Sequence, residues 1–68
     1  MTKFQIVYRL DNGKSNTFDL RDMDEVRREL VQANHSLHDV RQDPRTTGYT
    51  VVEIEDGKSF VIARNGAQ

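Results

Sequence analysis

Asp11-Asn12-Gly13-Lys14-Ser15 and Glu55-Asp56-Gly57-Lys58-Ser59 are two nearly identical stretches, and runs of alternating apolar residues flank each of them. Asn-Gly or Asp-Gly in that setting is a strong signal for a β-hairpin. Glycine supplies the positive φ that a tight turn requires, and Asn or Asp tolerates the same backbone region. The sequence therefore predicts one hairpin near each end of the chain.

The register of the first hairpin follows from its apolar pattern. Apolar side chains alternate over residues 4–10, as in a half-buried strand. A three-residue loop over 12–14 pairs Tyr8 with Phe18, whereas a two-residue loop pairs Tyr8 with a threonine. Because a slip of one residue turns a strand inside out, the three-residue loop is predicted.

The second hairpin gives the same result. A three-residue loop over 56–58 pairs Ile54 with Phe60 and places their apolar neighbours on one face. A two-residue loop would instead pair Glu53 with Phe60. We therefore expect the same three-residue, glycine-containing turn at both ends.

Between the hairpins, the chain carries the signals of one helix. Asp22 is placed to cap the free amides, and Glu25 stands at the capping-box position. Helical spacing then predicts an inward face made of Met23, Val26, Leu30 and Ala33, and an outward face made of Arg27, Arg28, Glu29 and Gln32. Asn34 is a plausible end of the helix.

These elements predict a single α+β domain over residues 1–68 with the order ββα(β)ββ. An antiparallel sheet of four or five strands carries one helix on one face, and a fifth strand over residues 37–41 is left open. The tail over 65–68 is expected to fray. The predicted core consists of Phe4, Ile6, Leu10, Phe18, Leu20, Val26, Leu30, Val52, Ile54, Phe60 and Ile62.

Composition narrows the function classes. The 68 residues include ten basic and eleven acidic side chains, for a formal charge of −1, and no cysteine. Disulfides, thiolate zinc sites and thiol catalysis are therefore excluded, and a reducing cytoplasm suits the chain. Residues 1–10 fit neither a signal peptide nor a membrane span, so no membrane partner is predicted.

No residue pattern predicts catalysis. Each Gly-Lys-Ser triplet resembles the end of a phosphate-binding loop, but Tyr8 and Val52 stand where its first glycine belongs. Polar residues that could bind a metal or transfer a proton gather only in one segment, at His35, Ser36, His38, Asp39 and Asp43. Hydrophilic linker residues explain that cluster better than a zinc site or a triad. We predict no enzyme, no cofactor and no metal.

A protein interface is the leading functional prediction. In the predicted registers Val7, Val51, Val61 and Ala63 point away from the helix, and apolar side chains with a polar rim are the usual anatomy of an interface. The predicted interface residues are Val7, Arg9, Tyr49, Val51, Glu53, Val61 and Ala63. They would serve a homodimer or another protein.

The sequence thus predicts a small non-enzymatic module that binds a protein and blocks or bridges it. By analogy of size and composition, it is similar to inhibitors encoded by phages or mobile elements that act on a host nuclease or immune complex. The alternative is an RNA- or DNA-contacting domain that uses exposed arginines, Arg27, Arg28, Arg41 and Arg45. Interleaved acids weaken that alternative, because phosphate binding favours an uninterrupted basic face.

Overall fold

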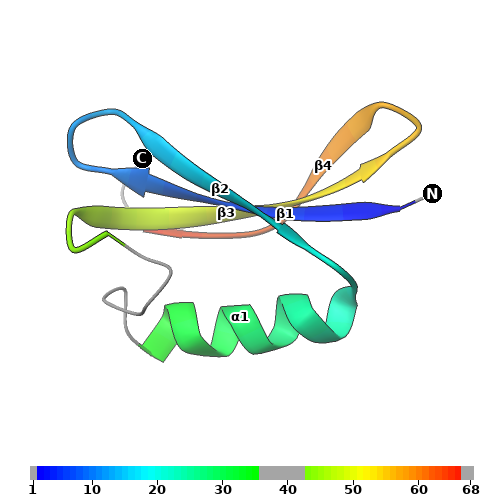
Figure 1. Cartoon of the computed structure of the whole chain (residues 1–68), viewed down its shortest axis with the longest axis horizontal. Coiled ribbons are helices and arrows are strands. Elements are labelled where there is room, and N and C mark those ends of the chain that lie inside the picture. The colour runs from blue at the N-terminus through cyan, green and yellow to red at the C-terminus, as the bar shows by residue number, and fades with distance from the viewer. Residues whose placement is uncertain (1, 36–42, 67–68) are drawn as a thin grey trace.

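The computed structural model describes residues 2–35 and 43–66, which form one antiparallel sheet and one helix (Figure 1). The elements are β1 (Lys3–Leu10), β2 (Ser15–Leu20), α1 (Met23–His35), β3 (Thr46–Glu55) and β4 (Lys58–Gly66). The strand order is β2-β1-β3-β4, and α1 lies on one side of the sheet. The predicted α+β class is confirmed; the optional strand over 37–41 lies outside the described residues.

The β1–β2 hairpin keeps the predicted loop length but not the predicted register. Leu10 N–H donates to Lys14 O at 2.8 Å, so the loop is Asp11-Asn12-Gly13 and starts one residue early. Phe18 therefore pairs with Ile6, and the predicted partner Tyr8 pairs with a different residue. Gly13, with φ of 84°, occupies the last loop position, which is the left-handed one in a three-residue hairpin. The register moves by two residues, so every side chain keeps its predicted face.

The β3–β4 hairpin contradicts the predicted three-residue loop. Asp56 and Gly57 form a two-residue turn with φ of 52° and 78°, the signature of a type I′ turn. Glu53 consequently pairs with Phe60, the arrangement that the sequence disfavoured. A β-bulge follows in β4. Val52 pairs with Val61 and Val51 pairs with Ala63, so Ile62 is one extra residue in β4. The bulge restores the predicted register for the rest of the strand.

This one-residue shift changes which side chains are buried. Val51 pairs with Ile6 in the centre of the sheet and is fully buried, although the sequence placed it on the open face. Four predicted core residues are instead half-buried or exposed: Val52, Ile54, Phe60 and Ile62. The buried apolar residues are Phe4, Ile6, Tyr8, Leu10, Leu20, Val26, Ala33, Tyr49 and Val51. Phe18 and Leu30, both predicted to be core, pack against that cluster and are half-buried.

β4 extends into the segment over 65–68 in which the sequence predicts a frayed tail. β4 continues through Gly66, and Asn65 donates from Nδ2 to Asn34 Oδ1 at 3.2 Å. Residues 65 and 66 are thus part of β4, and fraying of the tail over 65–68 stays a prediction. The remaining two lie outside the described residues.

The predicted helix start is confirmed. Glu25 N–H donates to Asp22 Oδ1 at 2.9 Å, and the Glu25 carboxylate accepts from Arg21 N–H at 2.8 Å. The hydrogen bond from the Glu25 amide is the main reason that the pKa of Asp22 lies below its usual value. Asn34 does not end the helix, since α1 includes His35.

Two tyrosines attach the helix to the sheet. Tyr8 on β1 donates its hydroxyl to the buried carboxylate of Glu29, a residue that the sequence placed on the outward face. On the neighbouring strand, Tyr49 donates to Asn34 Oδ1 at 2.6 Å. A buried carboxylate is costly without a donor, so the Tyr8 hydroxyl decides which helix face turns inward.

A matched pair of variants tests the corrected β3 register. Val51→Lys places an ammonium in the core and should unfold the protein, because a fully buried valine contributes roughly 1.5–3 kcal/mol before the cost of burying a charge. Val52→Lys, one residue further on the open face, should leave the fold intact. Denaturant unfolding measures both. Equal stability of the two variants would contradict the register.

A second prediction concerns the Tyr8–Glu29 hydrogen bond. Tyr8→Phe leaves the Glu29 carboxylate without that donor and should lower the free energy of unfolding by about 1–3 kcal/mol. Adding Glu29→Leu to Tyr8→Phe should recover most of the loss, since both polar partners are then gone. If the double variant is less stable than Tyr8→Phe alone, the hydrogen bond is not the source of the effect.

A third prediction concerns pH. Because the pKa of Asp22 is lowered by folding, its carboxylate stabilises the folded protein above the unfolded pKa of about 4, and this contribution is lost as the pH falls through the folded value. Asp22→Ala should lower the urea midpoint at neutral pH, and the gap to the parent should narrow below about pH 4. Asparagine also caps helices but does not titrate, so the difference in urea midpoint between Asp22→Asn and Asp22→Ala should stay constant with pH. If the difference in urea midpoint between the parent and Asp22→Ala does not change with pH, the capping role of the Asp22 carboxylate is contradicted.

Candidate protein-interaction site

The seven predicted interface residues do not share one face of the sheet. Val7, Arg9 and Val61 lie on the open face, whereas the other four lie on the side that carries α1. In the register, Tyr49 pairs with Tyr8, and Val51 pairs with both Ile6 and Ala63. Glu53 pairs with Phe4 and is also on the helix side. The predicted single patch is therefore wrong in its geometry.

Polar contacts cover part of the open face. Asp19 accepts a hydrogen bond from Gln5 at 2.9 Å and lies 3.9 Å from the Lys3 ammonium. The apolar residues left there are Val7, Val52, Ile54 and Val61, and the first three are half-buried. The hydrogen bond and the ion pair of Asp19 lie on the β1–β2 side of this face, and of the four apolar residues only Val61 is largely exposed.

The Arg9 side chain also makes its hydrogen bonds within the fold. Its guanidinium donates to Thr50 Oγ1 and, at 2.9 Å, to the carbonyl of Asn65, so one side chain links β1, β3 and β4. Its Nε is buried and has no hydrogen-bond partner among the described residues. Arg9 therefore holds strands together, and it does not project toward a partner.

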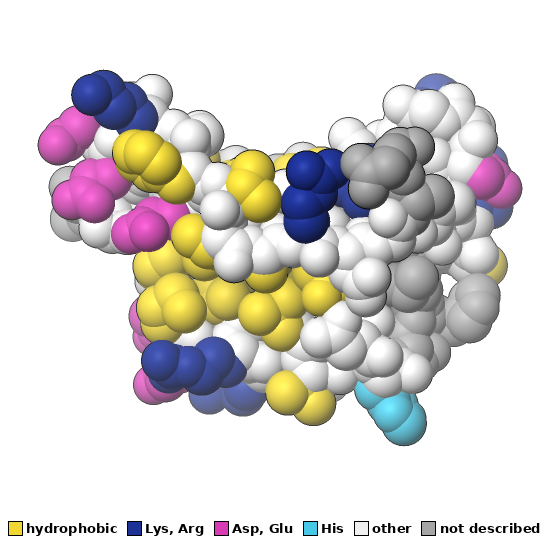
Figure 2. Space-filling model, turned by 180° about the vertical axis from the view of Figure 1, so that it is seen from behind, with side chains coloured by type: hydrophobic (Ala, Val, Ile, Leu, Met, Phe, Trp, Pro, Cys, Tyr) yellow, Lys and Arg dark blue, Asp and Glu magenta, His cyan; other side chains and the backbone are white. Residues whose placement is uncertain are grey.

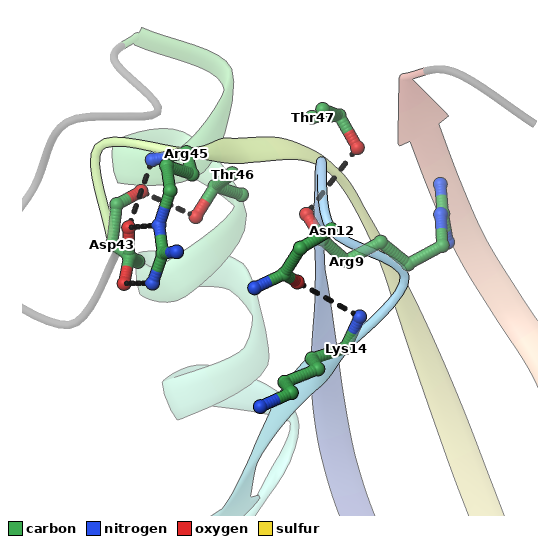
Figure 3. Close-up of polar contacts among 7 residues, drawn as sticks. All are labelled: Arg9, Asn12, Lys14, Asp43, Arg45, Thr46 and Thr47. Carbon is green, nitrogen blue, oxygen red and sulfur yellow. Dashed lines mark hydrogen bonds and ion pairs between the residues drawn. The ribbon is translucent and has the colours of Figure 1, made fainter.

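A shallow depression of about 460 Å³ lies on the open face beside the first turn, and Arg9 and Lys14 are among its lining residues. Figure 3 shows these two side chains pointing in different directions, so their charges do not converge on one point. Anion recognition relies on donors that converge. The depression lacks that arrangement.

The arginines of the nucleic-acid alternative are spread over the molecule. Arg27 pairs with Asp24 at 2.9 Å within the helix. Arg45 pairs with both carboxylate oxygens of Asp43 at 3.1 Å, which raises the pKa of Arg45 and lowers that of Asp43 (Figure 3). Arg28 follows Arg27 on the helix surface, and Arg41 lies outside the described residues. The described arginines form no continuous basic face.

The described part of the polar segment after the helix forms no metal site. Within residues 2–35 and 43–66, no three His, Asp or Glu side chains are arranged to hold a metal ion. His35 ends α1, and Asp43 is held by Arg45. Ser36, His38 and Asp39 lie outside the described residues.

A continuous apolar surface is found instead between α1 and β4. On the helix, Met23, Arg27, Leu30 and Asn34 follow one another at helical spacing and so share one stripe. Because Asn34 bonds to Tyr49 and Asn65, that stripe faces β3 and β4. The stripe thus borders the helix side of β4.

Phe60 and Ala63 lie on the helix side of β4, because Phe60 pairs with Glu53 and Ala63 pairs with Val51. We name the space between Phe60 and Ala63 on one side and Met23 and Leu30 on the other the α1–β4 groove. Figure 1 shows the β3–β4 hairpin rising away from the N-terminal end of α1, and Figure 2 shows hydrophobic side chains gathered in the resulting hollow. The asparagine bonds close one end, and the other end is open.

The open end of the groove leaves large apolar side chains in solvent. Phe60 is 52% exposed and Met23 is 40% exposed, and Ile62 at the adjacent bulge is 40% exposed. Single exposed apolar residues are common, but a contiguous group with a polar rim is typical of a binding surface. This groove is the strongest candidate site among the described residues.

Both rims of the groove carry charged side chains: Arg27 and its partner Asp24 on the helix, and Glu53, Glu55 and Lys58 on the hairpin. Arg27 lies on the helix stripe between Met23 and Leu30. Across the hollow, Glu53 and Glu55 lie on the helix side of β3, and neither has an ion-pair partner within the described residues. Figure 2 shows acidic and basic side chains beside the hairpin and also beside the helix.

Sequence reasoning missed this groove because it placed Phe60 and Ile62 in the core. The sequence does contain a signal: a two-residue turn at Asp56-Gly57 pairs Glu53 with Phe60. That pairing is tolerated because Phe60 on the edge strand β4 is 52% exposed and Glu53 beside it is only half-buried. An apolar residue opposite a glutamate was therefore a sign of exposure.

Comparison with known proteins gives no further guidance: no protein family model, no curated protein and no solved structure matches this chain. Among the described residues, no helix has the length and apolar character needed to cross a membrane.

Proposed function

We propose that this protein is a non-enzymatic protein-interaction module and that the α1–β4 groove is its contact surface. The observation that supports the proposal is the solvent exposure of Phe60 and Met23 on either side of the half-buried Leu30. Aromatic and methionine side chains are enriched in protein interfaces, where they fill complementary pockets. Blocking or bridging a partner is the proposed mode of action.

The charged rims give such a contact its orientation. Rim charges contribute to the choice of partner and to the rate of encounter more than to affinity. With Arg27 on one side of the apolar strip and Glu53 and Glu55 on the other, a partner of fitting polarity binds in one direction only. Inhibition of a host nuclease or immune complex stays a prediction from the sequence.

Affinity capture with matched variants tests the proposal. Phe60→Lys places a charge in the groove, and Val31→Lys makes the same change at a 70% exposed position of α1 outside the groove stripe. Tagged parent and variants are used to capture proteins from an extract of the cells that carry the gene. We expect Phe60→Lys to lose the captured protein, by roughly tenfold or more in affinity, and Val31→Lys to retain it.

Two checks make this test decisive. Circular dichroism must show that Phe60→Lys is folded, as expected for a half-exposed residue near a hairpin end. If the folded Phe60→Lys variant captures the same proteins as the parent, the groove is not the contact surface. Salt-sensitive binding of nucleic acid by the parent, lost on replacing Arg27 and Arg28, would favour the alternative function.

A further inference from the structure

We infer that the protein seated in the α1–β4 groove is a second copy of this chain, related by a two-fold axis; this inference rests on the proposed role of the groove as a protein-contact surface. A two-fold interface brings the same patch of each copy together, so the patch must complement itself. The α1–β4 groove meets this requirement in shape and in charge.

The apolar part of the groove is self-complementary. Each copy has a projecting element, the β3–β4 hairpin with Phe60 on its helix side, and a receiving surface, the strip between Met23 and Leu30. Within one copy the hairpin rises away from the helix (Figure 1), and Phe60 on it is 52% exposed, so the strip is left open. In the dimer, Phe60 of each copy packs on the strip of the other.

The charges fit the same arrangement. Glu53 is directly opposite Phe60 in the sheet, and Glu55 is the next residue on that face. Arg27 lies between the two residues that receive Phe60. Arg27 pairs with Asp24 in its own helix at 2.9 Å, and an exposed ion pair of this kind contributes little stability. Docking Phe60 on the other copy brings an unpaired glutamate next to Arg27, so Arg27 can exchange Asp24 for that glutamate, and the two-fold axis makes this contact twice.

Charge-reversal variants test the dimer by sedimentation velocity and light scattering over a wide range of concentration. The parent should be a dimer whose population rises with concentration. Arg27→Glu or Glu55→Arg alone places like charges together at both contacts and should weaken the dimer by roughly tenfold or more. An equimolar mixture of the two variants should dimerise again, because each mixed contact then joins opposite charges.

Matched controls separate this effect from general charge effects. Arg28→Glu makes the same change one position along the helix, away from the groove stripe, and should leave the dimer as strong as in the parent. Phe60→Lys should abolish it. A dimer that survives both Phe60→Lys and Arg27→Glu would place the interface elsewhere and overturn the inference.

The remaining outcomes distinguish this inference from the proposed function. If the parent is monomeric at every concentration while protein capture still depends on Phe60, the inference of a second copy is wrong and the groove binds a different protein. If the parent is monomeric and capture is independent of Phe60, both proposals fail. If dimerisation follows the charge-reversal pattern, the groove holds a second copy.

Discussion

The hydrogen bond from Tyr8 to the buried carboxylate of Glu29 is the contact on which the arrangement of this small fold depends. The apolar side chains of the sheet alone do not fix the orientation of α1, since hydrophobic contact is non-directional. A buried carboxylate must have its donor, and Tyr8 stands on β1, next to the edge strand β2. The helix is thereby drawn to the β2–β1 side of the sheet.

The aromatic ring of Tyr8 serves the core at the same time. It meets Phe18 edge-on with ring centroids 6.0 Å apart and Tyr49 at 6.5 Å, so one side chain joins three strands. Its hydroxyl and that of Tyr49 then bind α1 at two points, Glu29 and Asn34. With a helix of 13 residues tied in this way, the far strand β4 has no cover at its Phe60 end.

The elements were predictable from sequence because their signals are local. Asp22 and Glu25 form a cap within one turn, and Gly13 and Gly57 stand in turns that need positive φ. The face of β3 was not predictable from its own residues, because Tyr49, Val51, Val52 and Ile54 place apolar side chains on both faces. A single extra loop residue decided the choice. The contact between Glu29 and Tyr8 joins positions 21 residues apart, so no local sequence pattern predicts it.

The pairing of β3 with β1 buries Val51 opposite Ile6, whereas Phe60 lies on the helix side of β4 and is exposed because α1 is held over β1 and β2. A three-residue loop would have placed Ile54, rather than Glu53, opposite Phe60 on the helix side of the sheet. The type I′ turn and the bulge at Ile62 instead let β3 contribute to the core while β4 twists away from it. An exposed edge strand with apolar residues is ordinarily an aggregation hazard, which natural proteins reduce with charges or by covering the strand. In this chain Glu53 and Glu55 lie beside the exposed phenylalanine, and under the role that we propose for the groove these charges disfavour partners that do not present a positive charge beside an apolar strip.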